Sequence, residues 1–134
     1  ILKGDVILFY GEIGVGKTTF IKFLVNSLEK IDKKNISEIT SPTFSLMNQY
    51  KLNKFDIHHY DLYRLKSEKD ILSLNIFEDI SDKIVLIEWP EILGEHKPKN
   101  TIDINFEYGE NFNSRYLTIS AYEKLKIFDE FKSL

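Results

Sequence analysis

Residues 5–23 read DVILFYGEIGVGKTTFIKF, and this stretch decides the fold. Its first six residues form an apolar run of strand formers, which is typical of a buried central strand in a parallel sheet. A glycine-rich turn follows, and from residue 18 to about residue 31 the apolar residues return at helical spacing. The residues expected on the buried face of this helix are Phe20, Phe23, Leu24, Leu28 and Ile31. The stretch therefore predicts a strand, a loop and a helix.

The rest of the chain alternates strand and helix signals, and we expect a single domain over residues 1–134. Strands are predicted at 45–52, 55–65, 83–89, 101–108 and 115–122, and helices at 67–80 and from about residue 122. Residues 32–44 and 90–100 carry prolines and turn formers and are expected to be loops. The predicted fold is α/β, a P-loop NTPase-like, mostly parallel sheet flanked by helices, with an antiparallel hairpin near the C-terminus.

Composition narrows the class of protein. The net charge is −3, so no global positive field draws the chain to nucleic acid or to an anionic membrane. Cysteine is absent, which excludes disulfides and thiolate chemistry, and no apolar run approaches the roughly 18 residues that span a bilayer. We expect a cytoplasmic protein without membrane contact. Because the sequence begins at Ile1, we also expect that an N-terminal segment is missing.

The turn at residues 11–18 matches the pattern G-x-x-x-x-G-K-[ST]. Glycines allow backbone N–H groups to turn towards phosphate oxygens, and the following helix N-terminus adds partial positive charge. Lys17 is expected to pair with the outer phosphates of a nucleotide, and the Thr18 hydroxyl is placed to ligate Mg²⁺. The residues predicted to bind ATP or ADP are Gly11, Glu12, Ile13, Gly14, Val15, Gly16, Lys17, Thr18, Thr19 and Trp89.

Two acidic residues close predicted strands, at the edge where a parallel sheet presents its ligand. Asp61 closes the stretch FDIHHYD and Glu88 closes the stretch KIVLIE. Either carboxylate could ligate Mg²⁺ or position water, and spacing alone does not decide which one contacts the metal.

Four other features have competing interpretations. Thr43 could sense a γ-phosphate, as switch segments of GTPases do, although a proline-anchored turn is favoured on sequence alone. Arg64 could contact phosphate, but a surface ion pair is the commoner role.

His58 and His59 are neighbours on a strand and point to opposite faces, so we interpret both as structural. The string NKFD at 53–56 matches the guanine-reading pattern, yet its early position favours a hairpin turn, and adenine is the preferred base.

In this order, the segments GEIGVGKTTF, SPTFSLMNQY, YDLYRL and LIEWPE resemble the signature blocks of the TsaE (YjeE) family of bacterial P-loop ATPases. The resemblance runs from the first strand to the hairpin near Tyr116. It implies that Lys17 and Thr18 are the Walker A pair and that Asp61 is the Walker B acid. It also implies that Thr43 is switch-like and that Glu88 and Trp89 form a catalytic pair.

The resemblance further implies a role in making threonylcarbamoyladenosine in tRNA. Such an ATPase docks on the TsaB–TsaD heterodimer and reaches tRNA only indirectly, through that complex. From the residues themselves, the few groups able to stabilise transition-state charge predict weak intrinsic hydrolysis of Mg-ATP. The alternatives are a small-molecule or nucleotide kinase, a GTPase-type switch, and a binding module that uses nucleotide only as a structural cofactor.

Overall fold

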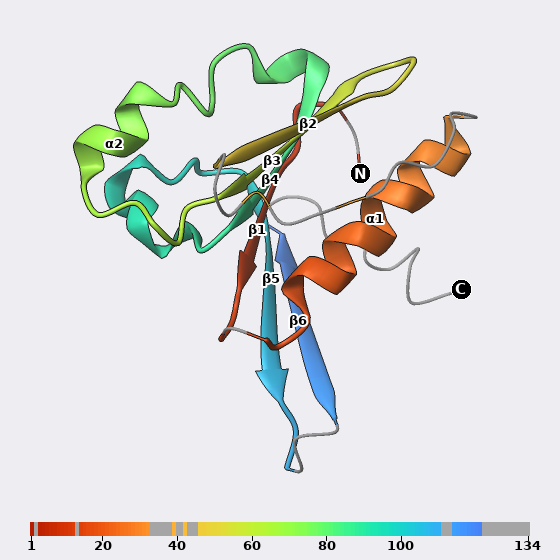
Figure 1. Ribbon diagram of the computed structural model, residues 1–134, viewed down its shortest axis with the longest axis vertical. Helices are drawn as coiled ribbons and strands as arrows, with labels where there is room; N and C mark the ends of the chain where they lie inside the picture. Colours follow the sequence, from red (N-terminus) through yellow and green to blue (C-terminus); the bar gives the residue numbers. More distant parts are fainter. Residues whose placement is uncertain are drawn as a thin grey trace.

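The apolar run after Asp5 becomes an inner strand of a six-stranded sheet in the computed structural model, which describes residues 1, 3–12, 14–32, 39, 42, 46–110 and 114–121. The strand order is β2-β3-β4-β1-β5-β6 (Figure 1). The strands are β1 (Val6–Tyr10), β2 (Met47–Lys51), β3 (Asp56–Asp61), β4 (Lys83–Glu88), β5 (Thr101–Tyr108) and β6 (Arg115–Ala121). The helices are α1 (Lys17–Ile31) and α2 (Glu68–Ser73), with 3₁₀ segments η1 (Ile80–Asp82) and η2 (Pro90–His96).

The pairing confirms a mostly parallel sheet. β1 runs parallel to both β4 and β5, and β3 runs parallel to β4. The antiparallel pairs are β2 with β3 and, near the C-terminus, β5 with β6. The carboxyl ends of β1, β3, β4 and β5 therefore share one edge of the sheet.

Alternating residues of β1 supply two cores on opposite faces of the sheet. Ile7 and Phe9 pack with residues of α1, whereas Val6 and Leu8 pack with residues of α2 and η2. Figure 1 shows α1 and α2 on opposite sides of the sheet. Both faces of β1 are covered. This explains why its apolar run contains no polar residue, as is typical of an inner parallel strand.

The buried face of α1 differs from the predicted one. Ile21 and Val25 are fully buried, while Phe23 is 69 % exposed and Ile31 is 78 % exposed. Helical spacing identifies an apolar stripe, but the sheet decides which part of that stripe it covers. Two large apolar side chains predicted to be core are thus on the surface.

Smaller elements follow local signals. Ser67 accepts a hydrogen bond at its Oγ from the Asp70 backbone N–H, 3.3 Å away, which confirms it as the N-cap of α2. Residues 90–96 form η2 rather than the predicted loop, with a kink at Gly94. Proline at the first position of η2 favours this helical start because its φ is already fixed near the helical value.

No helix in the described ranges is long and apolar enough to cross a membrane. Several predictions fall outside those ranges, namely the roles of Ile13 and Thr43, most of the 32–44 loop and the helix from about residue 122.

Candidate functional site

The predicted site residues from three separate segments meet at the carboxyl edge of the sheet. Gly11 follows β1 directly, Asp61 ends β3 and Glu88 ends β4. Glu88 is the register partner of Asp61 on one side and of Phe9 on the other. The sheet thus places both predicted acids beside the glycine loop, which we define as residues 11, 12 and 14–16.

Backbone contacts require glycine at the start of this loop. Gly11 has φ +142°, and a Cβ there would lie 2.9 Å from both the Phe106 carbonyl oxygen and Val15 Cγ1. A side chain would collide with β5, so the close approach of loop and strand depends on its absence. The loop then enters α1 through Gly16, which caps the helix in a left-handed conformation.

Lys17 is 5 % exposed and folds back over the loop. Its Nζ donates a hydrogen bond to the Gly11 carbonyl oxygen at 2.6 Å and lies 3.4 Å from the centroid of the Trp89 ring. Burial lowers the pKa of Lys17, and the nearby carboxylates of Glu88, Glu91 and Asp61 oppose that shift. A buried ammonium group at a glycine loop is a ready partner for an anionic ligand.

Thr18, Glu88 and His59 form a continuous chain of hydrogen bonds. Thr18 Oγ1 donates to Glu88 Oε1 at 3.1 Å, and Glu88 Oε2 lies 2.8 Å from His59 Nε2. Glu88 and His59 are 3 % and 0 % exposed. Both oxygens of this buried carboxylate are therefore held in a fixed orientation, as buried polar groups require.

Asp61 lies beside this chain and is also buried. Its Oδ1 accepts a hydrogen bond from the Tyr63 backbone N–H at 3.1 Å. Of the two acids, Glu88 is the one that the structure bonds to Thr18. In the described part of the chain no three histidine, aspartate or glutamate residues group as a metal site. A hydroxyl and two carboxylates nevertheless suit Mg²⁺, which usually takes one or two protein carboxylates and completes its shell with phosphate oxygens and water.

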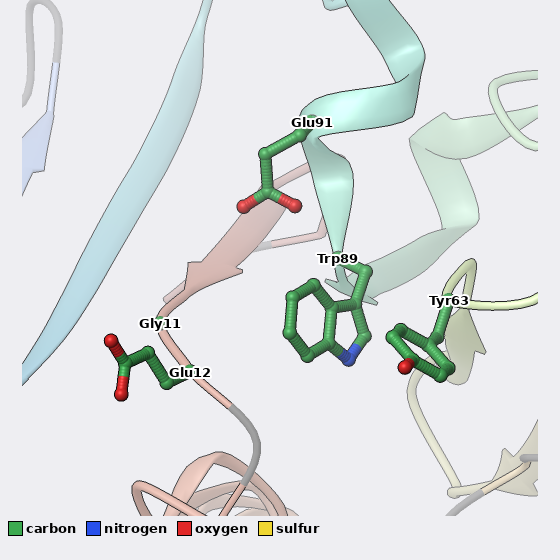
Figure 2. A pocket seen from close by; sticks show the side chains of 5 residues that line it. All are labelled: Gly11, Glu12, Tyr63, Trp89 and Glu91. Carbon is green, nitrogen blue, oxygen red and sulfur yellow. The ribbon is translucent and has the colours of Figure 1, made fainter.

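Trp89 lines a cavity on this side of the loop, which we call the Trp89 cavity. Its volume is about 550 Å³, and its walls are Gly11, Glu12, Tyr63, Trp89 and Glu91. Figure 2 shows the indole between the glycine loop and Tyr63, whose ring centroid is 4.9 Å from that of Trp89. Trp89 has φ 58°, which is unusual for a bulky residue and costs about 1–3 kcal/mol. This strained backbone sets the indole against Lys17.

A second hollow, the Phe23 groove, lies on the other side of the glycine loop. It has a volume of about 680 Å³ and is lined by Val15, Gly16, Thr19, Phe20, Phe23, Phe106, Arg115 and Leu117. Arg115 donates from Nε to the Val15 carbonyl oxygen at 3.2 Å, and its guanidinium carbon lies 4.2 Å from the Tyr108 ring centroid. The hairpin of β5 and β6 thus supports both the loop and the groove.

Two further predicted features lie on the segments after β3 and between β2 and β3. Arg64 is exposed beyond the end of β3. The NKFD turn joins β2 to β3, and Asn53 bonds there to Asp32 at the C-terminal end of α1 through its backbone N–H and, at 3.0 Å, its side-chain amide. Since α1 has 15 residues, this end lies about 20 Å along the helix from the glycine loop. The hairpin interpretation is confirmed, and the turn is remote from the loop.

Sequence reasoning missed His59 and Arg115. His59 was interpreted as structural, yet it holds the carboxylate of Glu88. Its signal was its position two residues before Asp61, which puts both side chains on the same face of β3. Arg115 stands 100 residues after its partner Val15, and no local pattern in the sequence connects them.

Comparison with protein-family models finds one that matches residues 1–117, described as threonylcarbamoyl adenosine biosynthesis protein TsaE. A tRNA threonylcarbamoyladenosine biosynthesis protein TsaE from Rickettsia conorii is 38 % identical over 120 residues, covering 90 % of this chain and 66 % of that protein. The protein of the same name from Nostoc sp. is 38 % identical over 125 residues, covering 89 % and 72 %. The chain thus spans about two thirds of the length of the Rickettsia relative.

Among solved structures, Bacillus subtilis YdiB matches with a TM-score of 0.66. The match covers 96 % of this chain and 76 % of YdiB at 22 % sequence identity. At that identity the likeness concerns the fold alone, and it agrees with the α/β sheet described above.

Proposed function

Because the chain belongs to the TsaE family of threonylcarbamoyl adenosine biosynthesis proteins, we propose that it binds and slowly hydrolyses Mg-ATP in support of tRNA threonylcarbamoyladenosine formation. The family and the P-loop-like fold together suggest a nucleotide-binding enzyme. The protein acts in the cytoplasm with the TsaB–TsaD heterodimer, contacts tRNA only through that complex, and does not bind membranes.

The proposal rests on one observation, which is that Lys17, Thr18 and Glu88 lie together beside the glycine loop. The Thr18–Glu88 hydrogen bond is 3.1 Å long, and Lys17 Nζ lies 2.6 Å from the Gly11 carbonyl oxygen. Transfer of a phosphoryl group to water needs a cation, a hydroxyl and a carboxylate beside a loop of backbone N–H donors. The glycine loop has all three groups beside it.

Each group has a distinct task in this proposal. Backbone N–H groups of the loop and Lys17 bind the phosphates and offset their charge. Thr18, Asp61 and Glu88 would hold Mg²⁺, which supplies electrostatic stabilisation of the developing phosphate charge. Glu88, oriented by His59, accepts a hydrogen bond from the attacking water and fixes its direction. Thr43 remains a predicted γ-phosphate sensor.

Partner-gated turnover is part of the proposal, because P-loop enzymes gain much of their rate from a cation aimed at the transferred phosphate. Of the two arginines of the chain, Arg115 donates to the Val15 carbonyl oxygen and Arg64 is exposed after β3. An arginine supplied in trans is worth roughly 10³- to 10⁵-fold in the rate of P-loop enzymes. The TsaB–TsaD complex is therefore expected to accelerate hydrolysis several-fold.

Titration with Mg-ADP tests nucleotide binding through the emission of Trp89, the single tryptophan of the chain. Phosphates that recruit Lys17 must draw its Nζ away from the indole, so emission should change with saturation. Calorimetry provides an independent measure of binding. Silence in both measurements would contradict the proposal.

Turnover requires a second experiment, in which ATP hydrolysis is followed with and without the TsaB–TsaD complex. A rate that rises several-fold supports partner gating, and an unchanged rate contradicts it. Phosphate transferred to an added metabolite or nucleotide instead of water would identify the kinase alternative.

A further inference from the structure

The outer edge of β6 is an exposed strand edge that the activity above does not use. In the described part of the chain, β6 is the last strand on its side of the sheet (Figure 1). Tyr116, Leu117 and Ile119 are 60 %, 45 % and 42 % exposed. They make up three of the seven large apolar side chains that are exposed among the described residues. Apolar surface concentrated on one element is typical of a protein–protein contact.

β6 lacks the features that keep an edge strand from pairing with another chain. Protected edges are usually short, or they carry lysine, proline or a β-bulge. β2, at the opposite edge, has five residues and ends at the exposed Lys51. β6 has seven residues, pairs with β5 in an unbroken register, and contains neither lysine nor proline. Its single charged side chain, Arg115, donates to the Val15 carbonyl oxygen. The outer edge of β6 is therefore suited to receive a further strand.

The sequence of β6, RYLTISA, matches a second copy of itself. If two β6 strands run antiparallel and all seven residues pair, Thr118 lies opposite Thr118 of the second copy, at a twofold axis. Leu117 then lies opposite Ile119 of the second copy, and Arg115 lies opposite Ala121. Apolar residues thus meet apolar residues, hydroxyl meets hydroxyl, and no two charges of the same sign are opposed.

The two faces of β6 also agree with this pairing. Ala121 belongs to the core that packs with α1, and Leu117 and Ile119 share its face because side chains alternate along a strand. Directly opposite residues of an antiparallel pair lie on the same face. A second β6 would therefore continue the apolar face on the α1 side and the polar face, with Thr118, on the other side.

From this arrangement we propose that two copies of the chain associate through their β6 strands, antiparallel about Thr118, so that their sheets join into one. Main-chain hydrogen bonds would supply affinity, and the Leu117–Ile119 pairs would fix the register. The twofold axis makes the contact closed, so association stops at a dimer. One strand from each copy buries less than the roughly 1,600 Å² of a standard interface, so we expect a dissociation constant in the micromolar range.

The test uses the position on the axis, where each residue faces its own copy. Sedimentation equilibrium of the full chain is measured from about 1 μM to about 200 μM for the unaltered protein, Thr118→Lys and Thr118→Glu. Thr118 is exposed, and charged side chains are common on edge strands, so both variants should fold, which thermal unfolding checks. Leu72→Lys is the matched control, because it adds the same charge at a 57 % exposed position of α2.

We expect the mass of the unaltered protein to rise from one chain to two across this range. Thr118→Lys and Thr118→Glu should each weaken association about tenfold or more, because like charges meet at the axis. An equimolar mixture of the two variants should restore the dimer, since opposite charges then face each other. Leu72→Lys should associate as the unaltered protein does.

Four results would overturn the proposal. They are an unaltered protein that stays monomeric at every concentration, Thr118 variants that associate normally, and a mixture that associates no better than either variant alone. The fourth is a lower melting temperature of both Thr118 variants at the lowest concentration, which would mean that the chain itself covers the edge. Every measurement is made without nucleotide, so failure here leaves the proposed function untouched.

Discussion

The Trp89 cavity and the Phe23 groove share the glycine loop as a common wall and differ in what they bury. Beside the Trp89 cavity, charged side chains are hidden, with Lys17 and Glu88 at 5 % and 3 % exposure. In the Phe23 groove, an apolar side chain is displayed, with Phe23 at 69 % exposure. Charged side chains are usually exposed and large apolar side chains are usually buried, so the two places are exceptions in opposite directions. In the proposed function, the buried charges of the Trp89 side would carry the chemistry.

Lys17→Ala should have the largest effect, because it removes the buried cation of the Trp89 side. Truncating one partner of a buried charged pair typically costs about 2–5 kcal/mol, so ADP affinity should fall by at least about 30-fold and hydrolysis should become undetectable. Calorimetry and a phosphate-release assay provide the measurements. Lys22→Ala, at an exposed position of the same helix, should change neither. Tight ADP binding by Lys17→Ala would show that ADP binding does not depend on the buried cation of the Trp89 side, which would contradict the contrast drawn above.

Glu88→Gln should separate catalysis from binding. Glutamine keeps the shape of the side chain but lacks the negative charge that orients the attacking water and would help to hold Mg²⁺, so kcat should fall by about 100-fold or more while ADP affinity changes only a few-fold. Steady-state kinetics at saturating ATP and calorimetry measure the two quantities. The control is Glu91→Gln, which alters an exposed carboxylate at the wall of the same cavity. Retained kcat in Glu88→Gln would exclude a role for the charge of the Glu88 carboxylate in hydrolysis.

Gly11→Ala tests the glycine loop, which is the common wall of the Trp89 cavity and the Phe23 groove. The added Cβ would meet Phe106 and Val15 atoms at 2.9 Å with φ +142°, so strain and overpacking together should lower the free energy of unfolding by roughly 2–4 kcal/mol. Urea denaturation measures the loss. At Gly16, also at positive φ but with no atom within 4 Å of an added Cβ, alanine should cost less. Equal losses at the two positions would show that backbone strain alone is responsible.

His59→Leu tests whether the buried carboxylate depends on its partner. Glu88 Oε2 would lose the imidazole 2.8 Å away, and an unsatisfied buried acceptor costs about 1–3 kcal/mol of unfolding free energy. His58→Leu, on the opposite face of β3, is the comparison, and His59→Gln should restore part of the loss. Stability that is equal in His59→Leu and in the unaltered protein would remove His59 from the site.

Asp103→Asn should have the smallest effect, since the Lys97–Asp103 pair, 2.7 Å apart, lies outside both hollows. The hydrogen bond to Asp103 raises the pKa of Lys97. The stabilisation of the folded protein by this pair is therefore fully present below the pKa of Lys97 in the unfolded chain. It is lost as the pH rises through the higher pKa of Lys97 in the folded protein. Because Lys97 is 38 % exposed, the loss at neutral pH should be about 0.2–1 kcal/mol, measured by thermal unfolding. A loss as large as that of His59→Leu would erase the distinction between buried and surface charge.

The sequence predicts those parts of this site that depend on local pattern. Residues 5–12 and 14–18 are confirmed as strand, loop and helix start because the apolar run, the glycines and the helical spacing all lie within one short segment. Asp61 and Glu88 were located at strand ends for the same reason. Each strand carries its own signal, and parallel strands necessarily align their carboxyl ends.

The parts that the sequence did not reveal depend on how distant segments align. His59 reaches Glu88 only because β3 and β4 pair in one register, 29 residues apart. Phe23 has the helical spacing of a core residue, yet its side chain is 69 % exposed in the assembled fold. Periodicity reports the direction of a side chain on its own element, whereas burial and partners are properties of the assembled sheet.

The hydrogen bond from Arg115 to Val15 also has a consequence for the timing of folding on the ribosome. The glycine loop is synthesised early, but the arginine that bonds it follows 100 residues later. At about 5–20 residues per second, the delay is roughly 5–20 s. A nascent chain therefore carries the glycine loop without this hydrogen bond, which forms only after β6 has emerged and paired with β5.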